Sequence, residues 1–313
     1  MRAEVSAPFY IIGLPGPVLR DAHIGSGVCI RQLEAEWIDE VRTQCPKVEA
    51  REQLESQHYT HRLCIEVPIE GDAMDYENEV TNDEKQPILR AIALSRIVKP
   101  TAIAYDNVWI KSVYSDSGEG KHYGEPEINA YSVAYVSATE IWNILTDEDA
   151  SLMAQLWDSL LHFLDNEPTY RRIVRALKYY ELAHAIYFTE LSHPVFHAAL
   201  ESMICTSRPN NKDQVTQRLP RLVPFVTPQQ AGDIYRTCCD FKHAAQALRQ
   251  TQTASGALAP SDQRRLDATI LLRQAVRELL LETLRNRTFA DMVADPTLLK
   301  QTHQVHDRKG RLV

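Results

Sequence analysis

The chain has 313 residues, 44% of them hydrophobic and 24% charged, a composition typical of a soluble globular protein with one large or two modest domains. A net charge of −8 excludes a strongly basic nucleic-acid-binding protein, and no apolar run reaches the roughly 20 residues of a membrane span. The six cysteines are scattered without a CxxC pair, which favours reduced thiols over a disulfide framework. We read no export signal at the N-terminus and expect a cytoplasmic location without membrane partners.

The charge is divided unevenly along the chain. Residues 1–150 hold 13 Lys and Arg against 26 Asp and Glu, a net −13, whereas residues 151–313 hold 21 against 16, a net +5. Such a division predicts two units with different partners. One hypothesis is that the acidic first half covers a basic cleft in the second half.

Residues 1–136 show the mixed patterns of an α+β region. Cys29–Thr43 has apolar residues at helical spacing, and His61–Gly71 alternates as a half-buried strand does. Ile88–Val98 is apolar and fits either a short helix or a buried strand. We assign a sensing or regulatory role to this region.

A long-looped hairpin is predicted next. Val108–Tyr114 and Ile128–Val136 are rich in β-branched and aromatic residues, and residues 115–127 between them are rich in Gly, Ser and charge. The segment Gly118-Glu119-Gly120-Lys121 partly resembles a phosphate-binding loop but lacks the full GxxxxGK[ST] spacing. A solvated loop is the favoured interpretation.

From residue 137 onward the pattern is helical, so the predicted class is mainly α, with a helical domain over 137–295 and a polar tail over 296–313. Thr146 and Asp149 mark a helix start. Further helices are expected over Thr169–Leu191, from Ser192 to Cys205, and from Ser261 to about Arg287. Residues 207–226 are expected to form a basic connection rich in Pro and Asn, with room for one helical turn.

The helix expected over Thr227–Gln250 contains the strongest indication of chemistry. Thr227, Pro228 and Gln230 are typical of a helix start. Arg236 and His243 are seven residues apart, so they lie about 20° apart on one helical face, opposite the apolar residues. An arginine can hold phosphate oxygens, and a histidine titrates near neutral pH. Asp240 can orient either group, although a plain surface pair of Arg236 with Asp240 also fits the spacing.

The segment Arg236–His243 also fits the RX4–6H motif of the HEPN superfamily, with six intervening residues. The order of the surrounding segments resembles ApeA-like HEPN proteins over about residues 150–287. The segments that carry this resemblance are Tyr179-Tyr180-Glu181, Ala198–Met203, Arg218–Leu222, Ile234-Tyr235-Arg236 and Leu271–Leu281.

The resemblance implies a helical-bundle endoribonuclease that uses no metal or cofactor, with Arg236 and His243 as catalytic residues. It also implies RNA as the substrate, a homodimer that brings two such pairs into one cleft, and a role in anti-phage defence or a toxin system. The family usually has Asn, Asp or His directly after the arginine, where this chain has Thr237. That difference motivates an alternative, a non-catalytic HEPN module that binds RNA or a partner protein, including a regulator.

Two other clusters contain residue types that bind metals or phosphates. His193 and His197 have a spacing found in metal sites, but no third ligand is identified, and we favour ordinary helix histidines. A basic cluster can follow a phosphate backbone, although a solvated helix face explains it equally well. Its members are Arg171, Arg172, Arg175 and Lys178.

Overall fold

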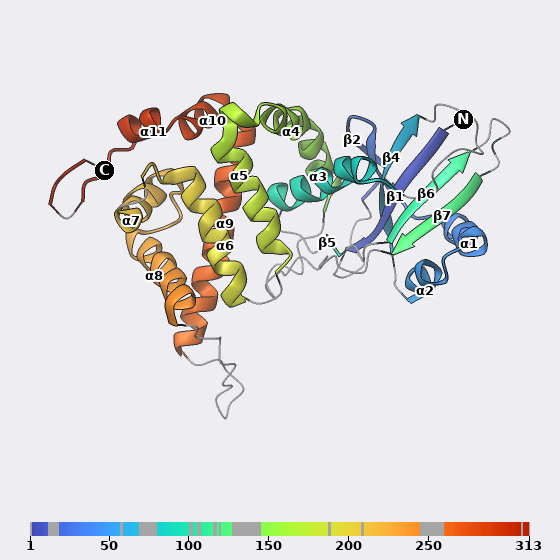
Figure 1. The fold of residues 1–313 in the computed structure, drawn as a ribbon, viewed down its shortest axis with the longest axis horizontal. Helices are drawn as coiled ribbons and strands as arrows, with labels where there is room; N and C mark the ends of the chain where they lie inside the picture. Colours follow the sequence, from blue (N-terminus) through green and yellow to red (C-terminus); the bar gives the residue numbers. More distant parts are fainter. Residues whose placement is uncertain are drawn as a thin grey trace. The chain divides into compact units, whose positions relative to one another are not determined.

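The computed structural model describes residues 2–11, 19–56, 59–68, 80–99, 103–104, 108–114, 118, 120–126, 145–186, 189–207, 210–244, 260–307 and 309–312. The contacts within the chain divide it into two compact units, Met1–Asp158 and Ser159–Val313. The expected class, mainly helical with an α+β N-terminal region, is confirmed (Figure 1). In the described ranges, no helix has the length and apolar character needed to cross a membrane.

An antiparallel sheet with the strand order β2-β3-β4-β1-β6-β7 forms the centre of the N-terminal unit, and β5 pairs with β1. Helices α1 and α2 contact β7, and α3 contacts β1, β3 and β4. The strands are β1 Arg2–Ile11, β2 Ala22–Gly25, β3 Val28–Gln32, β4 His61–Pro68, β5 Ile103–Ala104, β6 Val108–Tyr114 and β7 Gly120–Pro126. The helices are α1 Ala35–Gln44, α2 Val48–Ser56 and α3 Asn82–Val98.

Alternation places the core side chains of this sheet. Val5 and Ala7 of β1 pair in register with Ile65 and Leu63 of β4, and Val5, Ala7 and Leu63 are buried. The predicted strand over 61–71 is therefore confirmed for its first eight residues. Ile88–Val98, which the sequence left open, belongs to helix α3, whose start is stabilised by a capping box between Thr81 and Glu84.

Two predictions in this unit are wrong. Cys29–Thr43 is not one helix, because Cys29 pairs with Cys64 of β4 and a helix begins only at Ala35. The hairpin partner of β6 is β7, in the segment predicted to be a loop, and Ile128–Val136 lies outside the described residues. Lys121 pairs with Val113 in that ladder, so it belongs to a strand and not to a phosphate-binding loop.

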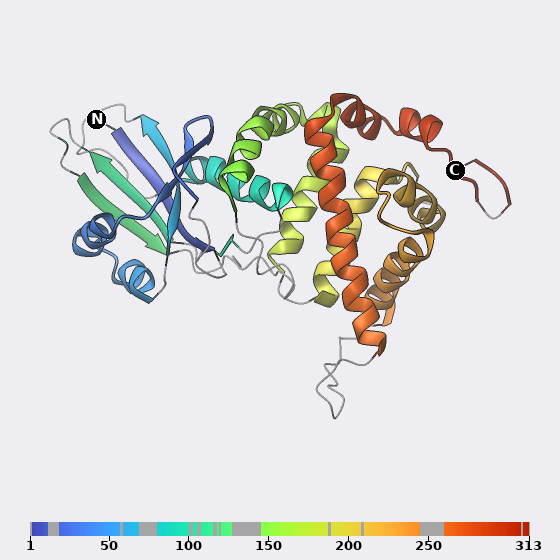
Figure 2. The same ribbon diagram turned by 180° about the vertical axis from the view of Figure 1, so that it is seen from behind.

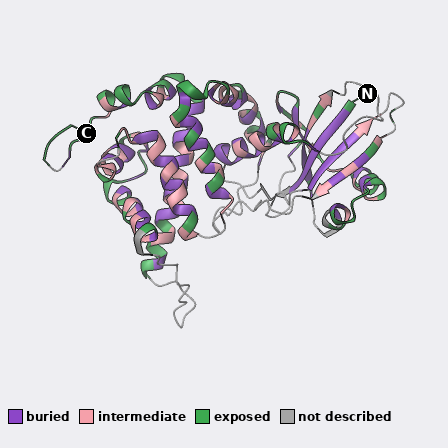
Figure 3. Ribbon diagram, viewed as in Figure 1, coloured by how far each residue is buried: buried purple, intermediate pink, exposed green. Residues whose placement is uncertain are grey.

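Helices build the C-terminal unit, and α9 runs along α5, α6 and α8 (Figure 2). The helices from α4 onward are α4 Asp147–Asp165, α5 Glu167–His184, α6 Thr189–Ile204, α7 Asn211–Leu222, α8 Pro228–Ala244, α9 Pro260–Arg285, α10 Arg287–Ala294 and α11 Pro296–Thr302. Their inward sides are buried (Figure 3). Buried residues of the core include Ile173, Leu200, Ile234, Leu272 and Leu280.

The predicted helix over 169–191 is in fact two helices, since α5 ends at His184 and α6 begins at Thr189. Ser192 consequently lies inside α6 instead of capping it. Helix α7 occupies most of the segment predicted to be a connection. The boundary between the compact units falls within α4, later than the expected 136/137.

The C-terminal tail is held against α7. Gln217 exchanges two hydrogen bonds with the backbone of His306, and Arg221 donates one to the carbonyl of Gln304. The polar tail thus includes the short helix α11 and a turn closed by a bridge between His306 and Leu312.

Candidate functional site

Helix α8 begins as its sequence predicts. The backbone N–H of Thr227 donates to the side-chain oxygen of Gln230 at 2.9 Å, and the N–H of Gln230 donates to the Thr227 hydroxyl at 3.2 Å. This reciprocal pair is a capping box, with Pro228 following as the first helical residue. The residue at which α8 begins therefore helps to decide which of its side chains face the interior and which face outward.

The apolar face of α8 packs into the unit. Ile234, Cys238 and Phe241 are buried, as their spacing predicts. His193 of α6 fastens this face, because its Nε2 lies 3.1 Å from the carbonyl oxygen of Ile234 and its ring meets Phe241 edge to face. The opposite side of α8 is therefore turned outward.

Arg236 lies on that outward side, with 65% of its side chain exposed. It donates to Asp233, one turn earlier, at 2.8 Å. Asp240, by contrast, lies 3.7 Å from Arg265 of α9. The surface pair of Arg236 with Asp240 that the spacing also allowed is therefore replaced by two other pairs, and Asp240 links α8 to α9.

His243 lies in the last turn of α8, and its side chain is outside the described residues. Helical spacing predicts that Ala245 and Leu248 extend the apolar face, and both residues also lie outside the described ones. Because α8 is helical from Pro228 to Ala244, the backbone positions of Arg236 and His243 keep the two-turn spacing that the motif requires.

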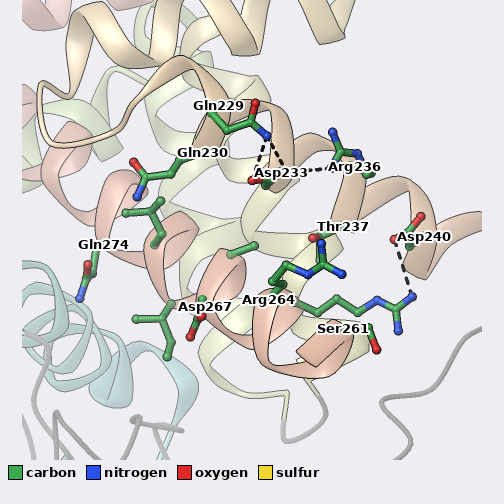
Figure 4. A pocket seen from close by; sticks show the side chains of 14 residues that line it. Gln229, Gln230, Asp233, Arg236, Thr237, Asp240, Ser261, Arg264, Asp267 and Gln274 are labelled. Atoms are coloured by element: carbon green, nitrogen blue, oxygen red, sulfur yellow. Dashed lines mark hydrogen bonds and ion pairs between the residues drawn. The ribbon is translucent and has the colours of Figure 1, made fainter. Parts of the chain in front are cut away.

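An open groove of about 660 Å³ lies along α8 and α9 (Figure 4). Arg236, Thr237 and Asp240 line it from α8, and Arg264 and Arg265 line it from α9. Three amide side chains also belong to the polar lining: Gln229, Gln230 and Gln274. Three of the four predicted site residues are thus brought to one groove, while the fourth, His243, cannot be placed there.

Positive and negative side chains are balanced in this groove. Its three arginines, Arg236, Arg264 and Arg265, face three aspartates, Asp233, Asp240 and Asp267. A polyanion that contacts Arg236 must therefore displace its pair with Asp233. Thr237 is only 5% exposed, so at most its hydroxyl contributes to the surface of the groove.

Arg264 and Arg265 were missed by sequence reasoning, which concentrated on the motif helix. A signal was present, because both lie within four residues of the predicted cap at Ser261. What the sequence lacks is the packing of the first turns of α9 against α8, which turns a separate basic pair into a wall of the same groove.

His193 and His197 are packing residues. Both are buried, and burial lowers the pKa of His193 to about 4 and that of His197 to about 3. His193 also contacts the hydroxyl of Thr269 at 2.8 Å through Nδ1. Across the described parts of the chain, no group of three or more His, Cys, Asp or Glu side chains is arranged to hold a metal ion.

The basic cluster on α5 divides between two sides of the helix. Arg172 turns inward and donates to the carbonyls of Ser202 and Met203 at the end of α6, and burial lowers its pKa to about 10. Arg171, Arg175 and Lys178 are exposed at a spacing that places them on one face. Two of the three guanidinium nitrogens of Arg172 thus serve carbonyl groups of the protein, and its part in binding RNA stays a prediction.

Comparison of the chain with protein-family models, with curated proteins and with solved structures finds no match.

Proposed function

We propose that the C-terminal unit is a metal-independent endoribonuclease of the HEPN type, with Arg236 and His243 as its catalytic residues. The single observation that carries the proposal is the position of Arg236. It is exposed, it lines an open groove with Thr237 and Asp240, and its helix continues for two turns to His243. The ordered resemblance over residues 150–287 supports it.

The proposed reaction is attack of a ribose 2′-OH on the adjacent phosphorus. A bond forms between the 2′ oxygen and phosphorus, and the bond to the 5′ oxygen breaks, leaving a cyclic phosphate and a 5′-hydroxyl. His243 takes part in proton transfer from the attacking 2′-OH to the departing 5′ oxygen, a role that contributes roughly 10²–10⁴-fold in rate. Arg236 holds the nonbridging oxygens, where negative charge accumulates in the transition state.

Asp233 is proposed to hold the Arg236 guanidinium in place until RNA binds. In the RNA-free protein the carboxylate of Asp233 holds Arg236 through one hydrogen bond. A phosphate offers the guanidinium a bidentate contact in exchange. Asp240 has a supporting role, because its pair with Arg265 ties the motif helix to α9.

The proposed assembly is a homodimer in the cytoplasm that places two Arg236/His243 pairs in one cleft. The N-terminal unit is proposed to sense a signal or bind a regulator, and the biological role to be anti-phage defence or toxin-like RNA cleavage. These parts of the proposal rest on the family resemblance.

The test is cleavage of a single-stranded RNA by the purified protein in EDTA. We expect cyclic phosphate products, and at least about a 100-fold loss of rate in His243→Ala and in Arg236→Ala. His306→Ala, at an exposed histidine of the tail, is the matched control and should cleave normally. Cleavage that is unchanged in His243→Ala, or absent under all conditions, would contradict the proposal.

The alternative function is a non-catalytic module that binds RNA or a partner protein. Two observations favour it: Thr237 follows the arginine in place of Asn, Asp or His, and the groove charges are balanced. RNA binding without turnover, with the same affinity in His243→Ala, would select this alternative.

A further inference from the structure

Arg264 enters the groove from the opposite wall to the motif helix. It lies in the second turn of α9, is exposed, and lines the same groove as Arg236 and Thr237 of α8 (Figure 4). Its Nε lies 3.3 Å from the carbonyl oxygen of Pro260, to which it donates. This bond holds one edge of the guanidinium, and within the described residues the two terminal nitrogens have no acceptor.

The three groove arginines differ in their carboxylate partners. Arg236 pairs with Asp233 at 2.8 Å, and Arg265 lies within 3.7 Å of both Asp240 and Asp262. Arg264 has no carboxylate partner among the residues that the structure describes. Its positive charge is thus the least compensated of the three.

The nearby aspartates are engaged elsewhere. Asp233 also accepts from Gln229, and Asp267, the third aspartate of the groove, accepts from Gln263 at 2.8 Å. Asp240 faces Arg265, as described above. An anion that approaches Arg264 therefore meets a guanidinium whose acidic neighbours already have other donors.

We propose that Arg264 binds a phosphate of the RNA strand, so that guanidinium groups from two helices hold the backbone across the groove. This inference rests on the proposed function and adds a residue outside the motif to it. The ligand class is a phosphodiester of single-stranded RNA, because a guanidinium with two terminal nitrogens exposed can contact two nonbridging oxygens at once. Arg265 serves a different purpose: it ties α8 to α9 and does not contact the ligand.

The experiment measures binding of a 2′-O-methyl RNA oligonucleotide, which lacks the attacking hydroxyl, by fluorescence anisotropy at several salt concentrations. The variants are Arg264→Gln, Arg264→Lys and Arg285→Gln. Arg285 is the matched control, because it is an exposed arginine of the same helix outside the groove. All three glutamine or lysine changes lie on the surface of α9, and circular dichroism melts check that each variant is folded.

We expect Arg264→Gln to weaken binding about 10-fold and to reduce the slope of log affinity against log salt by about 0.7, the value for one lost phosphate contact on a single strand. Arg264→Lys should keep the slope and recover part of the affinity, and Arg285→Gln should bind within about 2-fold of the natural protein. Equal affinity and slope in Arg264→Gln and Arg285→Gln would overturn the inference. If cleavage still depended on His243 in that case, the proposed function would stand alone. If the natural protein neither bound nor cleaved RNA, both would be overturned.

Discussion

At the scale of single residues, His197 is an unusual member of the core. It is 1% exposed, its ring meets Tyr235 edge to face, and both ring nitrogens lack a hydrogen-bond partner within the described residues. The nearest carboxylate oxygen, on Glu201, is 3.5 Å from Nδ1. Burial of unpaired polar atoms costs about 1–3 kcal/mol, so this histidine destabilises the fold.

We predict that His197→Phe stabilises the protein at pH 7.5 by about 1 kcal/mol or more, because an apolar ring replaces an unpaired polar one. The gain should increase at pH 5.5. The unfolded histidine takes up a proton below its ordinary pKa of 6.5, whereas the folded one stays neutral down to about 3. The natural protein therefore loses stability as pH falls through this window, by up to about 1.4 kcal/mol per pH unit, and the variant escapes that loss.

Urea unfolding at the two pH values measures both effects. His306→Gln, at an exposed histidine, is the control and should change neither. An equal gain in stability at pH 7.5 and pH 5.5 would contradict the prediction that the pKa of His197 is lower in the folded protein than in the unfolded one.

At the scale of elements, α7 joins parts of the C-terminal unit that are distant in sequence. Arg218 is fully buried on this helix. It donates to the carbonyl of Ile204 at the end of α6 at 2.8 Å, to the carbonyl of His303 after α11 at 2.9 Å, and to the side-chain oxygen of Gln214 at 2.7 Å. One side chain thus satisfies acceptors from three elements.

We predict that Arg218→Met lowers the free energy of unfolding by about 3 kcal/mol or more, because several buried acceptors lose their donor together. Arg221→Met is the matched control on the same helix. Within the described residues Arg221 donates only to the carbonyl of Gln304 at the surface, so its loss should cost about 1 kcal/mol or less. Urea denaturation compares the two, and equal losses would contradict the role assigned to Arg218.

At the scale of the whole molecule, the division of charge follows the division into units. The acidic excess lies in residues 1–150 and the basic excess in residues 151–313, close to the boundary between Asp158 and Ser159. An acidic unit lowers the local concentration of RNA near a basic one through long-range repulsion, and salt screens that effect.

We expect the fragment 159–313, once circular dichroism shows it to be folded, to bind RNA about 10-fold more tightly than the full chain at 50 mM salt. The difference should vanish at 0.5 M salt, where exposed charges are screened beyond about 5 Å. Equal affinity of fragment and full chain at low salt would reject the hypothesis that the N-terminal half restrains RNA binding.

Local features of the chain were predictable because their causes are local. The start of α8 depends on Thr227 and Gln230, three residues apart, and its buried face follows from a period of about 3.6 residues. The start of α4 was predicted for the same reason, since Thr146 and Asp149 cap it reciprocally. The alternation of His61–Pro68 likewise identifies a strand without any knowledge of its neighbours.

Contacts between distant segments decided the rest. Cys29 belongs to a strand because β4 pairs with it, although its sequence has helical spacing. Arg172 turns toward the end of α6 because carbonyl groups there accept its hydrogen bonds, and Arg264 joins the groove because α9 packs on α8. The charge and period of a segment depend on its own residues, whereas the partner of a side chain depends on which segment the fold brings beside it. Sequence thus identified the motif helix and its outward face, and the tertiary structure alone supplied the second wall of the groove.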